Sequence, residues 1–164
     1  MEEEKLIYVV VAEDDDSHAE AVKRALGQSG IKYRIRRITT WSEYQILVKE
    51  EEPDVVLLDL RLSDGWIFEN FPEVDFKSFP VIVMTSCTDV QMANKVFKYG
   101  AVEYLIKSLD TFNQISIIVQ QTLEKWNKLK DEKIRTKAEL KEYHLMVNTL
   151  MECRDKIEAL TSKN

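Results

Sequence analysis

The segment at residues 53–59 reads Pro-Asp-Val-Val-Leu-Leu-Asp. Its four consecutive apolar side chains, with a proline turn before them and a carboxylate after them, indicate a short strand that is buried on both faces. Runs of the same kind occur at Leu6–Ala12 and Pro80–Met84. Because strands buried on both faces are typical of a parallel sheet covered by helices, these three segments predict the centre of such a sheet.

Helical patterns alternate with short β-branched runs as far as about residue 126, which indicates successive βαβ units of an α/β domain. Pro72 interrupts the segment between Trp66 and Pro80, so we expect a third helix of only one or two turns. The arginine-rich second strand is expected at an edge of the sheet. The strands are predicted at Leu6–Ala12, Tyr33–Ile38, Asp54–Leu58, Pro80–Met84 and Val102–Ile106.

Capping signals predict where the helices begin and end. The fourth helix is expected over Asp89–Tyr99, where apolar residues that include Val90 and Phe97 repeat at helical spacing. Gly100 then supplies its left-handed end. The remaining signals are capping boxes at Ser17 with Glu20, Ser42 with Gln45 and Thr111 with Gln114, a hydrophobic staple between Trp41 and Ile46, and an end of the first helix at Gly27 or Gly30.

The 164 residues carry a net charge of −6, with ten basic and eight acidic residues in 121–164 and thirteen against twenty-one in the remainder. An acidic body argues against nucleic-acid binding, which needs clustered Lys and Arg, and suits a site that collects cations. No apolar run approaches the roughly eighteen residues that span a membrane, and the Met-Glu-Glu-Glu-Lys start lacks the basic region of a secretory signal. Cys87 and Cys153 lack the spacing of a disulfide framework or a zinc site. We therefore expect a cytoplasmic protein without a membrane segment.

Polar side chains follow the predicted strands at the point where each strand ends. Because parallel strands end at the same edge of a sheet, these side chains are expected to converge. Several carboxylates at one edge repel each other unless a cation joins them, and a few hard oxygen ligands suit Mg²⁺ better than zinc. The strand ends carry Glu13-Asp14-Asp15-Asp16, Asp59, Thr85-Ser86 and Lys107.

A lysine and a hydroxyl that face these carboxylates add what a phosphoryl group needs, a positive charge and a donor. No Gly-x-x-x-x-Gly-Lys-[Ser/Thr] loop follows the first strand, so a phosphate would be held by side chains. The simplest arrangement makes one carboxylate the covalent acceptor, which forms an aspartyl phosphate.

Over about residues 5–126 these features resemble the response-regulator receiver domain of two-component signalling. The resemblance rests on Val-Val-Ala-Glu-Asp-Asp-Asp, Pro-Asp-Val-Val-Leu-Leu-Asp-Leu-Arg-Leu, Pro-Val-Ile-Val-Met-Thr-Ser and Gly-Ala-Val-Glu-Tyr-Leu-Ile-Lys, in this order. It implies a doubly wound, flavodoxin-like α/β fold with a five-stranded parallel sheet in the order 2-1-3-4-5. It also implies a receiver domain at 1–126 and a helical extension at 127–164.

The resemblance assigns a role to each strand end. It makes Asp59 the phosphoacceptor, which takes a phosphoryl group from the phosphohistidine of a sensor histidine kinase or phosphotransfer protein. It makes Lys107 the residue that pairs with the phosphate, and Thr85 and Tyr104 the switch residues. Mg²⁺ is the implied cofactor, and its ligands would be the carboxylates of Glu13, Asp14 and Asp59 and the backbone carbonyl of Arg61.

The chain departs from the family pattern at several positions. Ser108 replaces the usual proline after the lysine, and Ser63 replaces a proline in the acceptor loop. Arg61 carries a charge beside the phosphate position, which would affect the lifetime of an acyl phosphate more than its formation. Asp15 and Asp16 are interpreted as charges at a helix N-terminus and not as metal ligands.

After Gly100 no glycine or proline interrupts the chain, which predicts one helix that runs to about residue 160. Its imperfect coiled-coil seam favours a parallel homodimer or a partner helix. The runner-up for 127–164 is a linker to an output module, and a resemblance of His144 to a kinase phosphoacceptor is faint. The seam positions are Phe112, Ile115, Val119, Thr122, Trp126, Leu129, Lys133, Thr136, Leu140, Tyr143, Val147, Leu150, Arg154, Ile157 and Thr161.

The function expected from the sequence is that of a phosphorelay switch, which modifies itself and is not a turnover enzyme. One alternative is a docking scaffold that works without phosphorylation and dimerises through its helix. Another is an aspartyl-phosphate phosphatase of the Asp-x-Asp type. Arg61 argues against the phosphatase, because it stands where the second aspartate should be.

Overall fold

The structure is a computed structural model that describes residues 6–70 and 76–161. The chain forms two compact units, Met1–Trp126 and Asn127–Asn164. Of the helices in the described ranges, none combines length with enough apolar character to cross a membrane.

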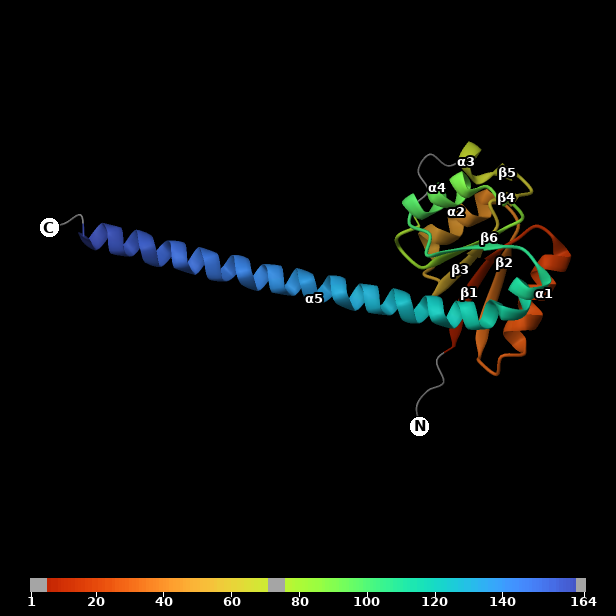
Figure 1. The fold of residues 1–164 in the computed structure, drawn as a ribbon, viewed down its shortest axis with the longest axis horizontal. Helices are drawn as coiled ribbons and strands as arrows, with labels where there is room; N and C mark the ends of the chain where they lie inside the picture. The colour runs from red at the N-terminus through yellow and green to blue at the C-terminus, as the bar shows by residue number, and fades with distance from the viewer. Residues whose placement is uncertain (1–5, 71–75, 162–164) are drawn as a thin grey trace. The chain divides into compact units, whose positions relative to one another are not determined.

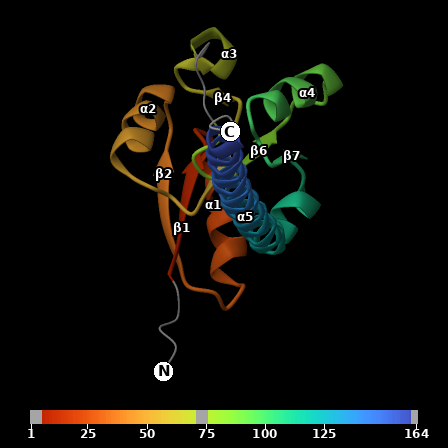
Figure 2. The ribbon, with the colours of Figure 1, turned by 90° about the vertical axis from the view of Figure 1, so that its left-hand side faces the viewer.

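A five-stranded parallel sheet forms the centre of the first unit (Figure 1). Its order, β2-β1-β3-β6-β7, is the predicted flavodoxin-like order 2-1-3-4-5, so the fold class is confirmed. Figure 2 shows β1 and β2 side by side, and their register pairs Val11 with Arg37. The strands are β1 (Ile7–Ala12), β2 (Tyr33–Ile38), β3 (Val55–Leu58), β6 (Val81–Thr85) and β7 (Glu103–Ile106).

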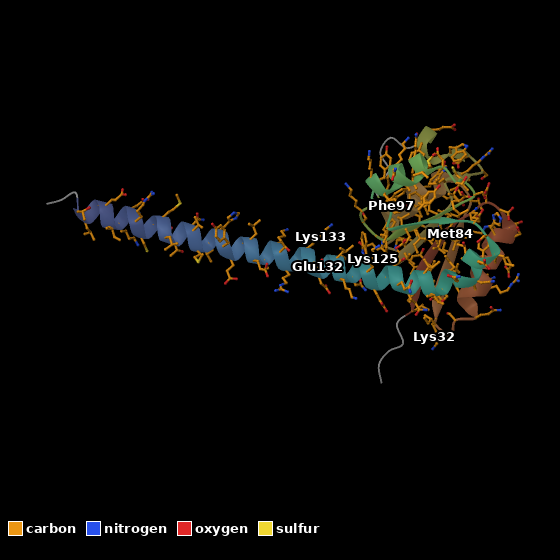
Figure 3. The ribbon with its side chains drawn as sticks, viewed as in Figure 1. Lys32, Met84, Phe97, Lys125, Glu132 and Lys133 are labelled. Carbon is orange, nitrogen blue, oxygen red and sulfur yellow. The ribbon has the colours of Figure 1, made fainter. Side chains whose placement is uncertain are left out.

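Helices cover both faces of the sheet (Figure 1). On one face, Val22 of α1 and Ile115 of α5 lie in the same buried cluster. On the other face, Trp41 of α2 and Val96 of α4 belong to a second cluster. Figure 3 shows Met84 of the sheet inside this unit and Phe97 of α4 at its surface. The helices are α1 (Asp16–Gly27), α2 (Trp41–Glu50), α3 (Ile67–Asn70), α4 (Val90–Lys98) and α5 (Leu109–Thr161).

The predicted capping boxes are wrong by two or three residues. The N-cap of α1 is Asp15, whose carboxylate accepts from the backbone N–H of His18. Thr40 forms the capping box of α2 with Glu43. Ser108 caps α5 by accepting from the N–H of Thr111 at 3.1 Å. Ser, Thr and Asp are all good N-caps. Where several of them lie close together, the path of the chain from the preceding strand decides which one caps the helix.

The predicted staple between Trp41 and Ile46 is also wrong. Trp41 is buried and donates its indole N–H to the carbonyl of Gly65, while Ile46 is 55% exposed. Helix α4 is confirmed, with Asp89 as its N-cap and Tyr99 as its C-cap. Its repeat does not form the buried face, however, because Val96 is buried whereas Val90 and Phe97 are exposed.

Two of the predicted glycine positions have the left-handed backbone. Gly30 has φ 75° and Gly100 has φ 105°. A Cβ on Gly100 would lie 2.9 Å from Cγ of Lys77 and 3.4 Å from the backbone of Phe76, so the end of α4 has no room for a side chain. Gly27 is the last residue of α1 and has no positive φ.

The connection after β3 contains a small hairpin, β4 (Arg61–Leu62) with β5 (Gly65–Trp66), which precedes α3. Helix α3 has four residues, so the prediction of a short third helix is confirmed. Pro72, which led to that prediction, lies outside the described residues.

Helix α5 contributes to both units. Within the first, Phe112, Ile115, Val119 and Thr122 are buried in the domain core. These seam positions are therefore already covered, and the expectation of a seam from Phe112 onward is wrong for its first part. Within the second unit, the seam residues Leu129, Leu140, Tyr143, Leu150 and Ile157 are 44–62% exposed.

Candidate functional site

The predicted site residues meet at the carboxyl ends of the parallel strands, where ligands bind in open α/β sheets. Glu13, Asp14, Asp59, Thr85 and Lys107 line one pocket. Backbone hydrogen bonds join the strand ends. The N–H of Asp59 donates to the carbonyl of Ala12 at 2.9 Å, and the N–H of Lys107 donates to the carbonyl of Thr85 at 2.9 Å. Tyr104 is not among the lining residues, although Cys87, whose carbonyl accepts from its hydroxyl, is one of them.

Three carboxylates form an acidic cluster in this pocket. One oxygen each from Glu13, Asp14 and Asp59 lies within 4.8 Å of the other two. Glu13 is buried, Asp59 is half-buried and Asp14 is exposed, so the cluster opens to solvent on one side. A small set of hard oxygen donors with room for water fits Mg²⁺.

Lys107 neutralises part of this cluster. Its Nζ lies 2.5 Å from a carboxylate oxygen of Glu13 and 2.5 Å from one of Asp59, and its side chain is only 5% exposed. Burial lowers the pKa of Lys107, but the hydrogen bonds to Asp59 and Glu13 and the negative charges of these two carboxylates together outweigh burial and raise this pKa above its usual value. The lysine is therefore a buried cation that faces the predicted acceptor.

Thr85 and Tyr104 are connected through Cys87. The hydroxyl of Thr85, which is buried, accepts a hydrogen bond from the N–H of Cys87 at 3.2 Å. The hydroxyl of Tyr104 donates to the carbonyl of the same residue at 2.7 Å. Burial and then Cys87 raise the pKa of Tyr104 to about 12, so this hydroxyl keeps its proton at neutral pH.

Arg61 lies in β4, two residues after Asp59. Its backbone N–H donates to the carboxylate of Asp59 at 3.2 Å, and its guanidinium lies 6.0 Å from the ring centroid of Trp66. The hairpin thus fixes the acceptor loop on one side of Asp59. That the carbonyl of Arg61 binds a metal remains a prediction.

Ser108, the residue that departs from the family pattern, has a structural role here. It is the N-cap of α5, and its hydroxyl also lies 2.9 Å from that of Thr111. Within the described ranges no peptide bond is cis. Asp15 likewise uses its carboxylate as a cap, which agrees with its interpretation as a helix N-terminal charge.

Two side chains near the acidic cluster were not predicted from the sequence. The Nδ1 of His18 lies 3.3 Å from Nζ of Lys107, and its ring stacks on Phe112. Arg37, from the end of β2, donates to the loop that carries Glu13. The signal for Arg37 was a basic residue at the end of a strand that neighbours the acidic loop. His18 carried no signal, because a histidine in a first helical turn is usually solvated.

Comparison with known proteins agrees with this geometry. The family model described as "Response regulator receiver domain" matches residues 9–120. The chain is 26% identical over 127 residues to "Methanogenesis regulatory protein FilR1" of Methanothrix harundinacea, covering 74% of this chain and 28% of that protein. It is 31% identical over 117 residues to "Transcriptional regulatory protein ZraR" of Klebsiella oxytoca, covering 70% and 26%.

The chain thus spans about a quarter of the length of these two relatives. Among solved structures, the Mn²⁺-bound form of response regulator Rcp1 is similar with a TM-score of 0.58 and 20% identity, over 68% of this chain and 91% of that one. This likeness shows the fold. Since the family model covers well over half of the residues, the chain belongs to the response regulator receiver domain family of two-component signalling.

Proposed function

We propose that this receiver accepts a phosphoryl group on Asp59 from a phosphohistidine donor, and that Mg²⁺ is required. The donor would be a sensor histidine kinase or a phosphotransfer protein. The observation that carries the proposal is the contact of 2.5 Å between Asp59 and Lys107 beside the carboxylates of Glu13 and Asp14. A divalent cation bound by these carboxylates would neutralise charge that develops on the phosphoryl oxygens.

In the proposed transfer, an oxygen of Asp59 forms the new P–O bond while the P–N bond of the phosphohistidine breaks. The imidazole keeps the electron pair and takes a proton from solvent. The N–H of Arg61 and the ammonium of Lys107 already donate to the two carboxylate oxygens, which orients the nucleophile. The ammonium of Lys107 is close enough to pair first with the carboxylate of Asp59 and then with the phosphoryl group bound to it.

The modified state is proposed to change the link between Thr85 and Tyr104. If the hydroxyl of Thr85 turns to a phosphoryl oxygen, it gives up the N–H of Cys87, and the carbonyl of Cys87 is the acceptor for Tyr104. A local change at the phosphate would thus reach the side chain of Tyr104. This is a switch of the kind in which added charge biases an element with two arrangements.

Removal of the metal is expected to stop the reaction. Incubation with acetyl phosphate and Mg²⁺ should add one phosphoryl group, seen by intact-mass spectrometry, and excess chelator should prevent the addition. The physical reason is the repulsion between the three carboxylates and an incoming phosphate, which the lysine alone does not offset. If no adduct forms with acetyl phosphate or with a phosphorylated histidine donor, the docking scaffold becomes the better account.

We further propose that residues 127–161 form a parallel homodimer through the seam residues Leu129, Leu140, Tyr143, Leu150 and Ile157. A helix that leaves such a stripe in water gains stability when a second copy covers it. The wild type is expected to have the mass of a dimer in light scattering coupled to gel filtration.

Leu140→Glu combined with Leu150→Glu is expected to weaken this dimer by more than about tenfold, because it places charges in the seam. Leu145→Glu is the matched control, since Leu145 is 68% exposed and lies off the seam. A monomeric wild type, or an equal effect of the seam and control variants, would exclude this dimer and favour the linker.

A further inference from the structure

The loop between β1 and α1 is clamped by one side chain from the neighbouring strand. Arg37 donates its Nε–H to the carbonyl of Glu13 at 2.9 Å and an Nη2–H to the carbonyl of Asp14 at 2.9 Å. Its Nη1 donates to the carboxylate of Asp16 at 2.7 Å. The fork of one guanidinium thus contacts three of the four consecutive acidic residues of this loop.

These contacts hold the backbone from which the acidic cluster projects. The N–H of Glu13 donates to the carbonyl of Ile38 at 3.0 Å, and the carbonyl of Glu13 accepts from Arg37. Both backbone polar groups of Glu13 are therefore bonded to residues of β2. Four carboxylates in a row would otherwise repel each other and splay the loop. Arg37 lies outside the pocket lining, so it acts through the loop and not by contact with a ligand in the pocket.

We propose that Arg37 is the positioning residue of the metal-binding loop: it fixes the backbone of Glu13 and Asp14 so that their carboxylates meet that of Asp59. The inference rests on the proposed function, because it concerns the Mg²⁺ site of that function. Outer groups that orient metal ligands are known to set metal affinity, and removing one typically costs 10–100-fold in affinity.

An effect of Arg37 through its charge and an effect through positioning would change the affinity for Mg²⁺ in opposite directions. If Arg37 acted only as a positive charge near a cation site, its removal would strengthen Mg²⁺ binding. If it positions the loop, its loss weakens Mg²⁺ binding. Lysine keeps the charge but lacks the planar fork, so Arg37→Lys isolates the positioning effect.

The test is a calorimetric Mg²⁺ titration of the full chain. Arg37→Lys and Arg37→Gln are both expected to weaken Mg²⁺ binding by about tenfold or more. The matched controls are Arg36→Lys and Arg36→Gln. Arg36 precedes Arg37 on β2, but it pairs with Glu51 away from the loop. The controls are expected to bind within about twofold of the wild type, since exposed pairs contribute little.

A second readout needs no metal. In metal-free protein, the amide hydrogens of Asp15 and His18 donate to carboxylates of the loop, and Arg37→Lys is expected to speed their exchange with solvent. Exchange in the central strands should stay as in the wild type, which shows that the variant is folded.

The outcomes separate the two proposals. A wild type that binds Mg²⁺ together with an Arg37→Lys variant of equal affinity and equal loop exchange would overturn the positioning role and leave the proposed function intact. Tighter binding by Arg37→Gln with unchanged Arg37→Lys would reduce Arg37 to a charge effect and overturn it too. A wild type that does not respond to Mg²⁺ would remove the metal site and this inference with it.

Discussion

Asp59→Asn is expected to abolish phosphoryl uptake, with a loss of at least about a thousandfold in the rate with acetyl phosphate. The amide has nearly the shape of the carboxylate but no anionic oxygen to attack phosphorus. The amide oxygen can accept from only one of the two donors, the N–H of Arg61 or the ammonium of Lys107, so one hydrogen bond is lost while the other residues that line the pocket are unchanged. The loss would therefore report the missing nucleophile and not a collapsed site.

Asp110→Asn is the matched control for this variant. Asp110 is an exposed aspartate in the first turn of α5, and it is not part of the pocket lining. The control should take up phosphate at the wild-type rate. Uptake by Asp59→Asn at a rate comparable to that of the control would place the acceptor elsewhere.

Lys107→Met is expected to lower the free energy of unfolding by about 3 kcal/mol or more in metal-free buffer. The substitution keeps the length of the side chain but leaves the carboxylates of Glu13 and Asp59 facing each other without the ammonium that lies 2.5 Å from each. Removing one partner of a buried charge pair is costly because the other charge stays buried. Mg²⁺ should recover part of the loss, since the proposed metal site consists of the same carboxylates together with Asp14.

Urea denaturation with and without Mg²⁺ measures this effect. Lys125→Met is the matched control, because Lys125 pairs with Glu103 at 3.3 Å but is 57% exposed. The control should change the free energy of unfolding by less than about 1 kcal/mol. A Lys107→Met variant as stable as the control in metal-free buffer would contradict a buried, stabilising contact.

The same variant has a defined pH dependence. Because the folded-state pKa of Lys107 is raised, the stability that its ammonium contributes is fully present below its unfolded pKa. It is lost as pH rises through the folded pKa. The difference between wild type and Lys107→Met should therefore stay constant from pH 7 to about 10 and shrink at higher pH.

The sequence was sufficient to predict the sheet and the convergence of the site. Runs such as Val55–Leu58 are apolar on both faces, and a parallel sheet brings the residue after each strand to one edge. Asp59 and Lys107 come together for this reason alone. Side chains that reach the site from elsewhere could not be predicted in this way, because the contacts of His18 and Arg37 depend on packing between α1, β2 and the loop.

The helix ends and the coiled-coil seam of α5 are a second kind of feature that the sequence alone predicts only in part. Thr40 and Ser42 are both good caps, and only the path of the chain from β2 decides that Thr40 caps α2. The heptad pattern of α5 is continuous in sequence, but the core of the domain takes up Ile115 and Val119. An apolar period indicates a buried face without saying which surface covers it.

The central claim, that Asp59 is the phosphoacceptor, is tested most directly by chemical trapping. Protein incubated with acetyl phosphate and Mg²⁺ is reduced with sodium borohydride, which converts an aspartyl phosphate to homoserine, and the modified residue is located by peptide sequencing in a mass spectrometer. The predicted result is homoserine at position 59 alone, absent when chelator replaces Mg²⁺. Homoserine at Asp14 or another carboxylate, or a phosphoryl group that stays on His18, would contradict this account.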